Sequence, residues 1–434
     1  MQIQQPEKLK APCLDVMNFL NEVTLWYPSA ISFAPGRPAE HLFDVENELA
    51  TLARYVEHTA LTSNQHKSKI FNQLGQYQKT NGIINDLLCR FLERDEAIYT
   101  TPEAIMLTDG CQEGMTILLA GLFNPLTDVL FVTDPTYIGI TGIAAILGIE
   151  IYPVPSTREG IDLNALRDSI EQIRTQGKNP KALYVIPDFN NPLGTCMPLA
   201  DRQHLLDLAN EQKILLIEDN AYGMFAYDAE RMPTLKALDR EGVVVYLGTF
   251  SKILFPSIRL GFLIADQHII TADATSTHCL AEELSKVKSF TTVTTSALLQ
   301  AIAAGILLEA ECSLRARVQK KVDFYRANRD TMLQCFDTHF SRDPLLAGKV
   351  SWNHPQGGFF LTVDLPFAFT NAMLATCAEN YGVICCPMSF FSLRGQGENQ
   401  VRLSFSYVSQ DEIERGVSQL WKFVHDTVQA SAFA

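Results

Sequence analysis

The strongest constraint on the fold of this chain is an alternation between about residues 80 and 300, where short apolar runs are separated by amphipathic segments of helical length. The apolar runs read "DVLFVT" (128–133), "IEIYPVP" (149–155), "ALYVIP" (182–187), "ILLIED" (214–219), "VVVYLGT" (243–249) and "RLGFLIA" (259–265). Continuous apolar strands separated by helices are typical of a parallel sheet that is covered on both faces. We therefore predict an α/β fold with a mostly parallel central sheet and helices on both of its faces.

The pattern changes after a long helical stretch at about residues 296–336. The runs "GGFFLTVDL" (357–365) and "VRLSFSYV" (401–408) predict strands of a separate antiparallel unit, and an amphipathic helix is expected from Asp411 to the end. A chain of 434 residues is long enough for a large domain and a smaller one. We predict a large domain at 76–315, a C-terminal small domain at 316–434, and an N-terminal segment, 1–75, that contributes to the small domain.

Composition narrows the classes of partner. A formal net charge of −14 argues against a nucleic-acid-binding protein and against adhesion to anionic membranes. The longest apolar stretch, near 296–310, is too short to span a bilayer, and the first residues lack the apolar core of a signal peptide. Ten cysteines without a Cys-x-x-Cys pair and nine histidines without metal-ligand spacing indicate reduced thiols and no metal site. We expect a cytoplasmic protein.

Side chains that could bind a ligand or take part in a reaction follow the apolar runs. In sheets of this kind, ligands bind beyond the carboxyl ends of the strands, so residues at those ends are candidates for a binding site. The candidates are Gly110, Cys111, Gln112, Tyr137, Asn191, Asp219, Tyr222, Thr249, Ser251, Lys252 and Arg259. Taken singly, Gly110 can be an ordinary turn, Asp219 a helix cap or ion pair, and Lys252 a solvated loop charge. Together they form a set that one cofactor requires.

That cofactor is pyridoxal 5'-phosphate. Backbone amides at a helix start, hydroxyl groups and the guanidinium of Arg259 suit a phosphate. The ring of Tyr137 can stack on the cofactor ring, and the carboxylate of Asp219 can keep the ring nitrogen protonated so that the ring accepts electrons. The amine of Lys252 can form a Schiff base with the aldehyde. We predict that Lys252 carries the cofactor and that Arg259 binds its phosphate.

Over nearly its whole length the chain resembles the fold-type I, class I/II aminotransferases, which depend on pyridoxal phosphate, and within them the branch of 2-aminoadipate aminotransferases. The resemblance rests on motifs that occur in the family's order: "ISFAPGRP", "QYQKTNG", "TDGCQEG", "DPTY", "PDFNNPLG", "EDNAY", "TFSK" with the following arginine, "PQGGFF", "GVICCPMSFF" and "VRLSF". It implies an aminotransferase that moves the amino group of an α-amino acid to a 2-oxo acid.

The resemblance also implies a role for individual residues. Lys252 corresponds to the Schiff-base lysine, which also shuttles the proton of the substrate α-carbon. Asp219 corresponds to the partner of the ring nitrogen, and Tyr137 to the stacking ring. Asn191 and Tyr222 correspond to the pair that hydrogen-bonds the phenolate oxygen of the cofactor. The catalytic residues are therefore expected to be Lys252, Asp219 and Tyr222.

Phosphate and substrate contacts follow from the same resemblance. Arg402, in "VRLSF", corresponds to the arginine that binds the substrate α-carboxylate, and Gly36 to a glycine in the segment that closes over the substrate, where Asn191 also contributes. Tyr77 corresponds to a tyrosine that reaches the phosphate from the neighbouring subunit, which implies a homodimer with shared active sites. The phosphate cup is expected to comprise Gly110, Cys111, Gln112, Thr249, Ser251 and Arg259.

Several residues depart from the family pattern, namely Arg37, Asp109, Cys111, Glu113, Asp188, Asn190 and Met388. They leave open a second reaction, in which a pyridoxal phosphate enzyme catalyses elimination, substitution or cyclisation of a functionalised amino acid, for example a hydroxylated arginine-like one. The acidic departures could suit a cationic side chain, although a solvated or helix-capping role is the simpler interpretation; Arg37 could suit an acidic one. A regulatory protein of the same fold is disfavoured, because about thirty residues before "ISFAPGRP" are too few for a helix-turn-helix module.

Overall fold

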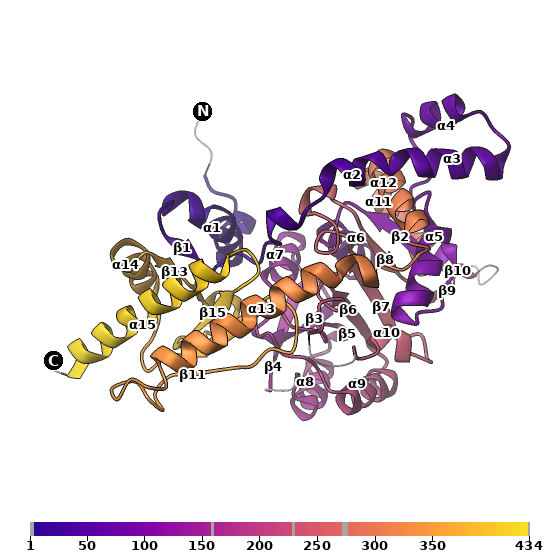
Figure 1. The fold of residues 1–434 in the computed structure, drawn as a ribbon. Helices are drawn as coiled ribbons and strands as arrows, with labels where there is room; N and C mark the ends of the chain where they lie inside the picture. The colour runs from indigo at the N-terminus through magenta and orange to yellow at the C-terminus, as the bar shows by residue number, and fades with distance from the viewer. Residues whose placement is uncertain (1–3, 158–159, 228–230, 271–276, 433–434) are drawn as a thin grey trace.

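The computed structural model describes residues 4–157, 160–227, 231–270 and 277–432. Its centre is a seven-stranded sheet with the strand order β2-β8-β7-β6-β5-β3-β4 (Figure 1). All neighbouring strands pair in parallel except β8, which is antiparallel to both β2 and β7. The prediction of an α/β fold with a mostly parallel sheet is therefore confirmed. The strands are β2 (Ile105–Thr108), β3 (Asp128–Asp134), β4 (Glu150–Pro155), β5 (Asn179–Val185), β6 (Leu215–Asn220), β7 (Val244–Thr249) and β8 (Gly261–Ile264).

The structure differs from the sequence interpretation in several places, and the predicted strands at 357–365 and 401–408 are shorter, at Phe360–Asp364 and Gln400–Ser404. Strand β2 was not among the expected strands, because its four residues form no long apolar run. Strand β8 begins at Gly261 rather than at Arg259, which lies in the left-handed region at φ 44°. The expected helical stretch at 296–336 is two helices, α12 (Ala297–Glu309) and α13 (Arg315–His339), interrupted at Glu311 and Cys312, which both have positive φ.

Helices cover both faces of the central sheet, and alternate residues of each strand point to opposite faces. On β6, Ile217 packs in the layer under α6, α7 and α11, while Leu216 packs in the layer under α8 and α9. Figure 1 shows α6 and α7 on one side of the sheet and α8 and α9 on the other. These helices and the short α10 have the bounds α6 (Cys111–Leu122), α7 (Ile138–Leu147), α8 (Leu163–Thr175), α9 (Leu199–Gln212), α10 (Leu235–Leu238) and α11 (Leu280–Thr291). We call the first side the α6 face and the second the α9 face.

The C-terminal part forms a four-stranded antiparallel sheet with the order β11-β12-β15-β14. Helix α13 runs from the large sheet to this part and packs against α15 (Figure 1). The elements not yet given are β11 (Ser351–Trp352), β12 (Phe360–Asp364), β13 (Val383–Ile384), β14 (Cys386–Pro387), β15 (Gln400–Ser404), α14 (Asn371–Tyr381) and α15 (Gln410–Ala432).

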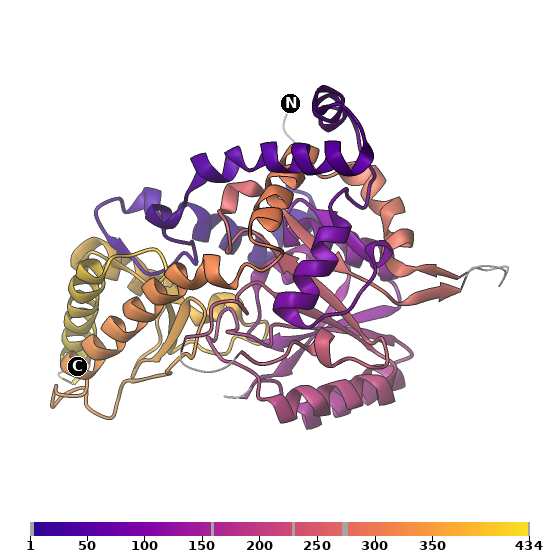
Figure 2. The same ribbon diagram turned by 45° about the vertical axis from the view of Figure 1, so that its right-hand side comes forward.

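The N-terminal segment contacts both parts of the molecule. Strand β1 pairs in parallel with β13, α1 packs on α7, and α3 packs on α12. Figure 2 shows α2 and α3 running across the top of the molecule, above α12. The domain limits drawn from the sequence stay a prediction. The remaining elements are α1 (Pro12–Trp26), β1 (Ile31–Ser32), α2 (Val45–Ala50), α3 (Leu52–Ser63), α4 (Lys67–Leu74), α5 (Asn85–Phe91), β9 (His268–Ile270) and β10 (Thr277–Cys279).

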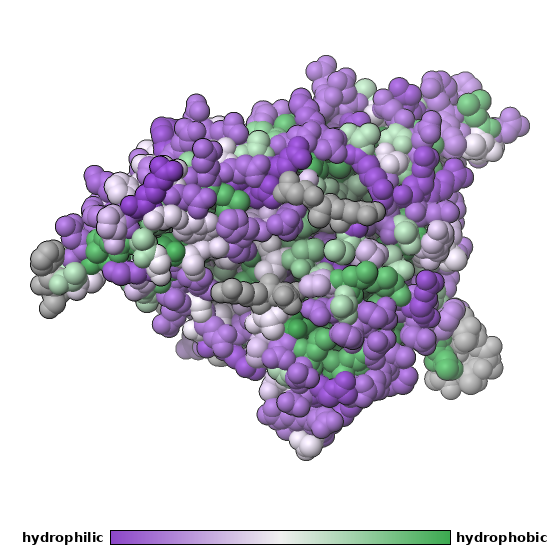
Figure 3. Space-filling view, turned by 60° about the horizontal axis from the view of Figure 1, so that its bottom comes forward, coloured by the Kyte–Doolittle hydropathy of each residue, from purple (hydrophilic) through white to green (hydrophobic). Residues whose placement is uncertain are grey.

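The outer surface is mainly hydrophilic in the view of Figure 3, with hydrophobic residues gathered towards the centre of that face. Among the described residues, none of the helices combines the length and the apolar character needed to cross a membrane. The same part of the chain holds no cluster of three or more potential metal ligands.

Candidate active site

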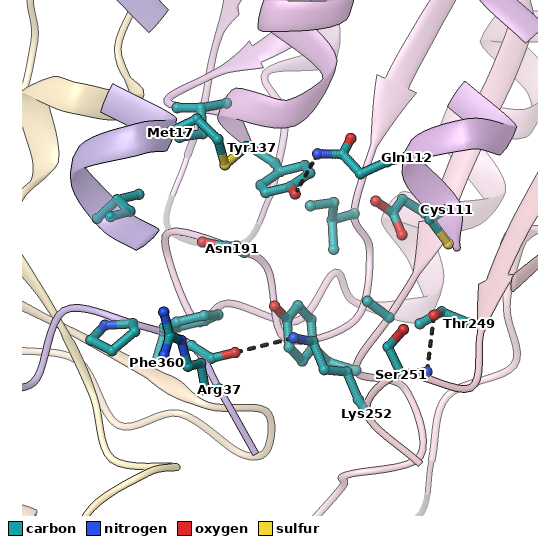
Figure 4. Close-up of a pocket in the computed structure, with 18 of the residues that line it drawn as sticks. Met17, Arg37, Cys111, Gln112, Tyr137, Asn191, Thr249, Ser251, Lys252 and Phe360 are labelled. Carbon is teal, nitrogen blue, oxygen red and sulfur yellow. Dashed lines mark hydrogen bonds between the residues drawn. The ribbon is translucent and has the colours of Figure 1, made fainter. Parts of the chain in front are cut away.

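The carboxyl ends of the central strands open into a pocket of about 270 Å³ (Figure 4). It brings together twelve of the residues predicted from the sequence. Gly110, the residue before Cys111, does not line it, and neither does Tyr77, which is 77% exposed. The twelve are Gly36, Cys111, Gln112, Tyr137, Asn191, Asp219, Tyr222, Thr249, Ser251, Lys252, Arg259 and Arg402.

One end of the pocket is an anion cradle formed where α6 begins. Gly110 precedes the helix at φ 80°, and a Cβ at this position would lie 2.5 Å from Nη2 of Arg259. Glycine is therefore needed both for the backbone conformation and for the close approach of the guanidinium. Arg259 donates to the carbonyl oxygen of Asp109 over 3.2 Å and lies 3.5 Å from Oγ of Ser251. Free amides at a helix start beside a guanidinium are suited to a phosphate.

Strand β7 supplies the rest of the cradle. Thr249 is its last residue, and its Oγ1 accepts a hydrogen bond of 3.1 Å from the backbone N–H of Ser251. The thiol of Cys111 donates to the carbonyl oxygen of Gly248 over 3.2 Å. Burial raises the pKa of this thiol well above its usual value, so Cys111 is a neutral group in the cradle. Figure 4 shows Cys111, Thr249 and Ser251 at one end of the pocket.

Lys252 lies between the two ends of the pocket. Its Nζ donates to the carbonyl oxygen of Gly36 over 3.1 Å (Figure 4). Burial, and next the positive charge of Arg259, lower the pKa of Lys252 to about 8. A lysine with such a pKa has an appreciable neutral fraction near pH 7, and only the neutral amine is a nucleophile or a base.

Asp219 lies near the end of β6 and faces the pocket with a carboxylate that is only half bonded. Its Oδ2 accepts a hydrogen bond of 2.6 Å from Oη of Tyr184, whereas its buried Oδ1 has no hydrogen-bond partner within the described part of the chain. Burial raises the pKa of Asp219 to about 6, against the opposing effects of Tyr184 and Lys252. Buried polar atoms are normally hydrogen-bonded, so the Oδ1 atom indicates a ligand that donates a proton there. The protonated ring nitrogen of pyridoxal phosphate fits that requirement.

Tyr137 and Gln112 form one wall of the pocket. Tyr137 is the residue before α7, and its hydroxyl accepts a hydrogen bond of 3.3 Å from Nε2 of Gln112 (Figure 4). Burial raises the pKa of Tyr137, so its ring is neutral and presents an aromatic surface to the cavity. An aromatic surface of this kind suits stacking on a flat ligand ring.

Arg402, on β15, brings the C-terminal sheet into the site. Its guanidinium carbon lies 4.4 Å from the ring centroid of Phe360 and 4.6 Å from that of Phe391, and Nη1 donates to Oδ1 of Asn191 over 2.7 Å. Nη2 donates to the carbonyl oxygen of Ala34, while the buried Nε lacks a partner among the residues described. Burial lowers the pKa of Arg402, but a guanidinium remains charged in proteins. A buried cation held in one plane is suited to a carboxylate.

The sequence interpretation missed an apolar wall of the pocket. Met17 and Leu20, from α1, join Ile138, Phe360 and Phe391 in lining it. Met17 and Leu20 are three positions apart and so share one face of the helix, but this spacing alone does not show what that face contacts. Tyr184 was also missed, because it lies inside an apolar run rather than after it.

Two acidic departures from the family pattern lie in ion pairs rather than in the pocket. Glu113 pairs with Nζ of the buried Lys288 at 2.9 Å, and Asp188 pairs with the buried Arg202. Neither carboxylate lines the pocket, so neither a substrate contact nor a solvated role applies to them. Arg37, in contrast, does line the pocket (Figure 4).

Comparison with known proteins assigns the family. The profile of the family "Aminotransferase class I and II" matches residues 46–420. The chain is 40% identical over 412 residues to (S)-3,5-dihydroxyphenylglycine transaminase of Amycolatopsis orientalis, covering 95% of this chain and 92% of that protein.

Two solved structures are similar over almost the whole chain. The multiple substrate aminotransferase of Thermococcus profundus has a TM-score of 0.79 and 28% identity, covering 99% of this chain and 97% of the other. LysN, the alpha-aminoadipate aminotransferase of Thermus thermophilus, complexed with N-(5'-phosphopyridoxyl)-L-leucine, has a TM-score of 0.75 and 26% identity, covering 95% of each chain.

The chain belongs to the class I and II aminotransferases. It has the fold-type I architecture of these enzymes, and its cofactor is pyridoxal 5'-phosphate. It is an aminotransferase, which takes an amino group from an amino acid. The comparisons therefore favour transamination over the elimination or cyclisation that the sequence left open.

Proposed function

We propose that the pocket at the carboxyl ends of β5, β6 and β7 is the transamination site, with Lys252 as its proton carrier. The observation that carries the proposal is the juxtaposition of an amine with a pKa near 8 and a buried carboxylate that keeps one unbonded oxygen. Lys252 would hold the cofactor aldehyde, the cradle around Arg259 its phosphate, and Asp219 its ring nitrogen. Asn191 and Tyr222 line the same pocket and are suited to the phenolate oxygen.

Bound pyridoxal phosphate supplies a ring that accepts electrons released at the substrate α-carbon. The chain supplies the proton transfers. Lys252 would be freed when the substrate amine takes its place, and as a neutral amine it would remove the substrate α-proton, carry it and release it again. Asp219 remains ionised and so keeps the ring nitrogen protonated, which favours electron withdrawal.

Arg402 orients the substrate in this proposal. Its guanidinium is the buried cation on the C-terminal side of the pocket, and its Nε and Nη groups form a planar fork that matches an α-carboxylate. The two phenylalanine rings on either side hold that plane. Binding at the carboxylate therefore places the α-carbon within the range of Lys252, which turns proton transfer into an intramolecular step.

We further propose that the amino donor has an aromatic or bulky apolar side chain. Met17, Leu20, Ile138 and Phe391 offer an apolar surface where a substrate side chain would lie. The name of the relative from Amycolatopsis orientalis, a dihydroxyphenylglycine transaminase, agrees with an aromatic substrate. The acceptor is a 2-oxo acid.

The proposed assembly is a cytoplasmic homodimer with shared active sites. Tyr77 is exposed, as are Leu61, Phe71 and Phe290, and exposed large apolar side chains favour a protein interface. In the dimer, Tyr77 of the partner subunit would complete the phosphate cradle. The ten cysteines are all described and all free thiols, which supports a reducing compartment.

The test is reduction of the holoenzyme with borohydride, followed by peptide mapping. Lys321 provides an internal control, because burial also lowers its pKa to about 8 but it does not line the pocket. We expect the pyridoxyl group on Lys252 alone, and we expect Lys252→Ala to lose the formation of 2-oxo acid from phenylalanine. A label on Lys321, or normal turnover by Lys252→Ala, contradicts the proposed site. Faster turnover of lysine or aspartate than of phenylalanine contradicts the proposed donor class.

A further inference from the structure

Tyr184 is a buried tyrosine next to the site that lines no part of the pocket. It lies on β5, its side chain is 0% exposed, and its hydroxyl donates to Oδ2 of Asp219 over 2.6 Å. A distance of 2.6 Å is typical of an O–H group bonded to an ionised oxygen. Tyr184 therefore reaches the reaction only through the carboxylate of Asp219.

Strand pairing explains how the two residues meet. Tyr184 lies opposite Ile217 in the parallel pair of β5 and β6, and Asp219 is two positions further along β6. Residues two apart on a strand share one face, so both side chains are on the α6 face, where a long side chain can reach its diagonal neighbour. Apolar side chains of the same layer include Leu130, Val132 and Leu247.

The bond leaves the two carboxylate oxygens of Asp219 with different surroundings. Oδ2 is engaged by Tyr184, and Oδ1 is buried without a partner in the described part of the chain. The ionisable side chains near this pair in the described part of the chain include Lys252, Cys111, Tyr137 and Tyr222. Among the described residues, Tyr184 and Lys252 favour the ionised form of Asp219, whereas burial favours the protonated form.

We propose that Tyr184 is a positioning residue for the cofactor ring: its hydroxyl binds Oδ2 of Asp219, keeps that carboxylate ionised and leaves Oδ1 available to the ring nitrogen. This inference rests on the proposed role of Asp219. A hydrogen bond at one oxygen restricts the rotation of the carboxylate, so the second oxygen has a preferred direction. Without the hydroxyl, the carboxylate would be a charge in an apolar layer, and the proton it shares with the ring nitrogen would move towards the carboxylate.

The structure contains a matched control, a second buried tyrosine on the other neighbour of β6. Tyr246, on β7, is also buried, and its hydroxyl accepts a hydrogen bond of 3.0 Å from Nδ2 of Asn220, the residue after Asp219. It is opposite Glu218 in the pairing of β6 and β7 and therefore belongs to the α9 face. Tyr246→Phe removes a buried hydroxyl next to β6 without touching Asp219.

The experiment uses holoenzyme loaded with pyridoxal phosphate that carries ¹⁵N at the ring nitrogen. In Tyr184→Phe we expect the ¹⁵N resonance to move from the protonated position towards that of an unprotonated pyridine nitrogen, and the cofactor dissociation constant to rise about tenfold, as for the loss of one hydrogen bond to a charged group. Tyr246→Phe should leave the resonance in place, even if its melting temperature falls. Incorporation of 4-aminophenylalanine at 184, a weaker donor of similar shape, should give a smaller movement in the same direction, and it replaces Tyr184→Phe should that variant not fold.

The variant Asp219→Asn distinguishes a failure of the role of Tyr184 from a failure of the proposed site. If it moves the resonance while Tyr184→Phe does not, the role of Tyr184 is wrong and the proposed site stands. If Asp219→Asn leaves the resonance unchanged, Asp219 is not the partner of the ring nitrogen, and both proposals fail. An equal movement in Tyr184→Phe and Tyr246→Phe would mean a general loosening of β6, which also overturns the role of Tyr184.

Discussion

Glu218 and Asp219 are adjacent on β6 and face opposite sides of the central sheet, and their buried carboxyl groups differ in hydrogen bonding. Glu218 faces the α9 face, where its two oxygens accept hydrogen bonds of 2.8 Å from the backbone N–H groups of Leu235 and Lys236, at the start of α10. Asp219 faces the pocket, where one oxygen is bonded and the other is not. Both carboxyl groups have a raised pKa because of burial, so burial alone does not distinguish a functional carboxylate from a structural one.

Two buried arginines differ in the same way, in whether each guanidinium nitrogen has a hydrogen-bond partner. Arg202, on α9, uses Nε, Nη1 and Nη2 in bonds to the carbonyl oxygens of Met197, Pro233 and Pro187, and it also pairs with Asp188. Arg402 has Nε without a partner in the described chain, and its guanidinium lines the pocket. Glu218 and Arg202 therefore bond their polar atoms within the protein, whereas Asp219 and Arg402 line the pocket and each keep one atom without a partner among the described residues. An unpaired buried atom alone does not mark the site, because Oδ2 of Asp188 also lacks a partner in the described chain and Asp188 does not line the pocket.

The largest expected effect comes from exchanging the two carboxyl groups for amides. Asp219→Asn should lower kcat about a thousandfold or more, roughly 4 kcal/mol of transition-state stabilisation, because an amide does not hold a proton on the ring nitrogen. Glu218→Gln should keep kcat within a few-fold and instead lower the free energy of unfolding by about 1–3 kcal/mol, since its NH₂ group faces a backbone donor. Steady-state kinetics and urea unfolding of both variants check this. The reverse pattern would refute the contrast between the faces.

Removal of the buried arginine of the α9 face should mainly affect stability. Arg202→Met leaves the Asp188 carboxylate buried without its cation, and we expect the free energy of unfolding to fall by about 3 kcal/mol. The KM for the amino donor should stay within twofold of the original, because Arg202 does not line the pocket. Unfolding in urea and kinetics on the same preparation provide the two readouts. A tenfold change in KM without loss of stability would place Arg202 in the site.

Replacement of the pocket arginine, Arg402, should mainly affect substrate binding rather than stability. Arg402→Leu should lower kcat/KM for α-carboxylate substrates about a hundredfold, roughly 2.7 kcal/mol, chiefly through KM. Arg402→Lys should recover only part of this loss, because an ammonium group cannot form the planar fork. The comparison of kcat and KM for both variants measures the effect. Unchanged kinetics in Arg402→Leu would remove this residue from substrate binding.

The smallest expected effect is a dependence of stability on pH that belongs to Glu218. Burial raises its pKa from 4.5 to about 7, so between these values the folded protein retains a proton that the unfolded chain releases. The contribution of Glu218 to stability is therefore greatest below pH 4.5 and falls as the pH rises towards 7. The stability difference between the original protein and Glu218→Gln should shrink over this range, on the order of 1–2 kcal/mol. A constant difference in urea unfolding would contradict the raised pKa.

The order of elements and the residues at the ends of the strands could be predicted from the sequence for a physical reason. Apolar runs separated by amphipathic helices have few stable arrangements other than a covered parallel sheet, and in such a sheet the carboxyl ends meet at one edge. Residues as distant in sequence as Tyr137, Asn191 and Lys252 were expected together on that basis, and all three line the pocket.

Only the tertiary structure decided which side chains complete the site. The contact between Tyr184 and Asp219 depends on β5 being the neighbour of β6. The apolar pattern of a strand does not determine which strand lies beside it in the sheet. The position of α1 over the pocket and the two rings beside Arg402 likewise depend on how separate units dock. Local sequence determines the periodicity of apolar and polar residues in each helix and strand. The partner of a buried polar atom is determined by packing between segments that are remote in the chain.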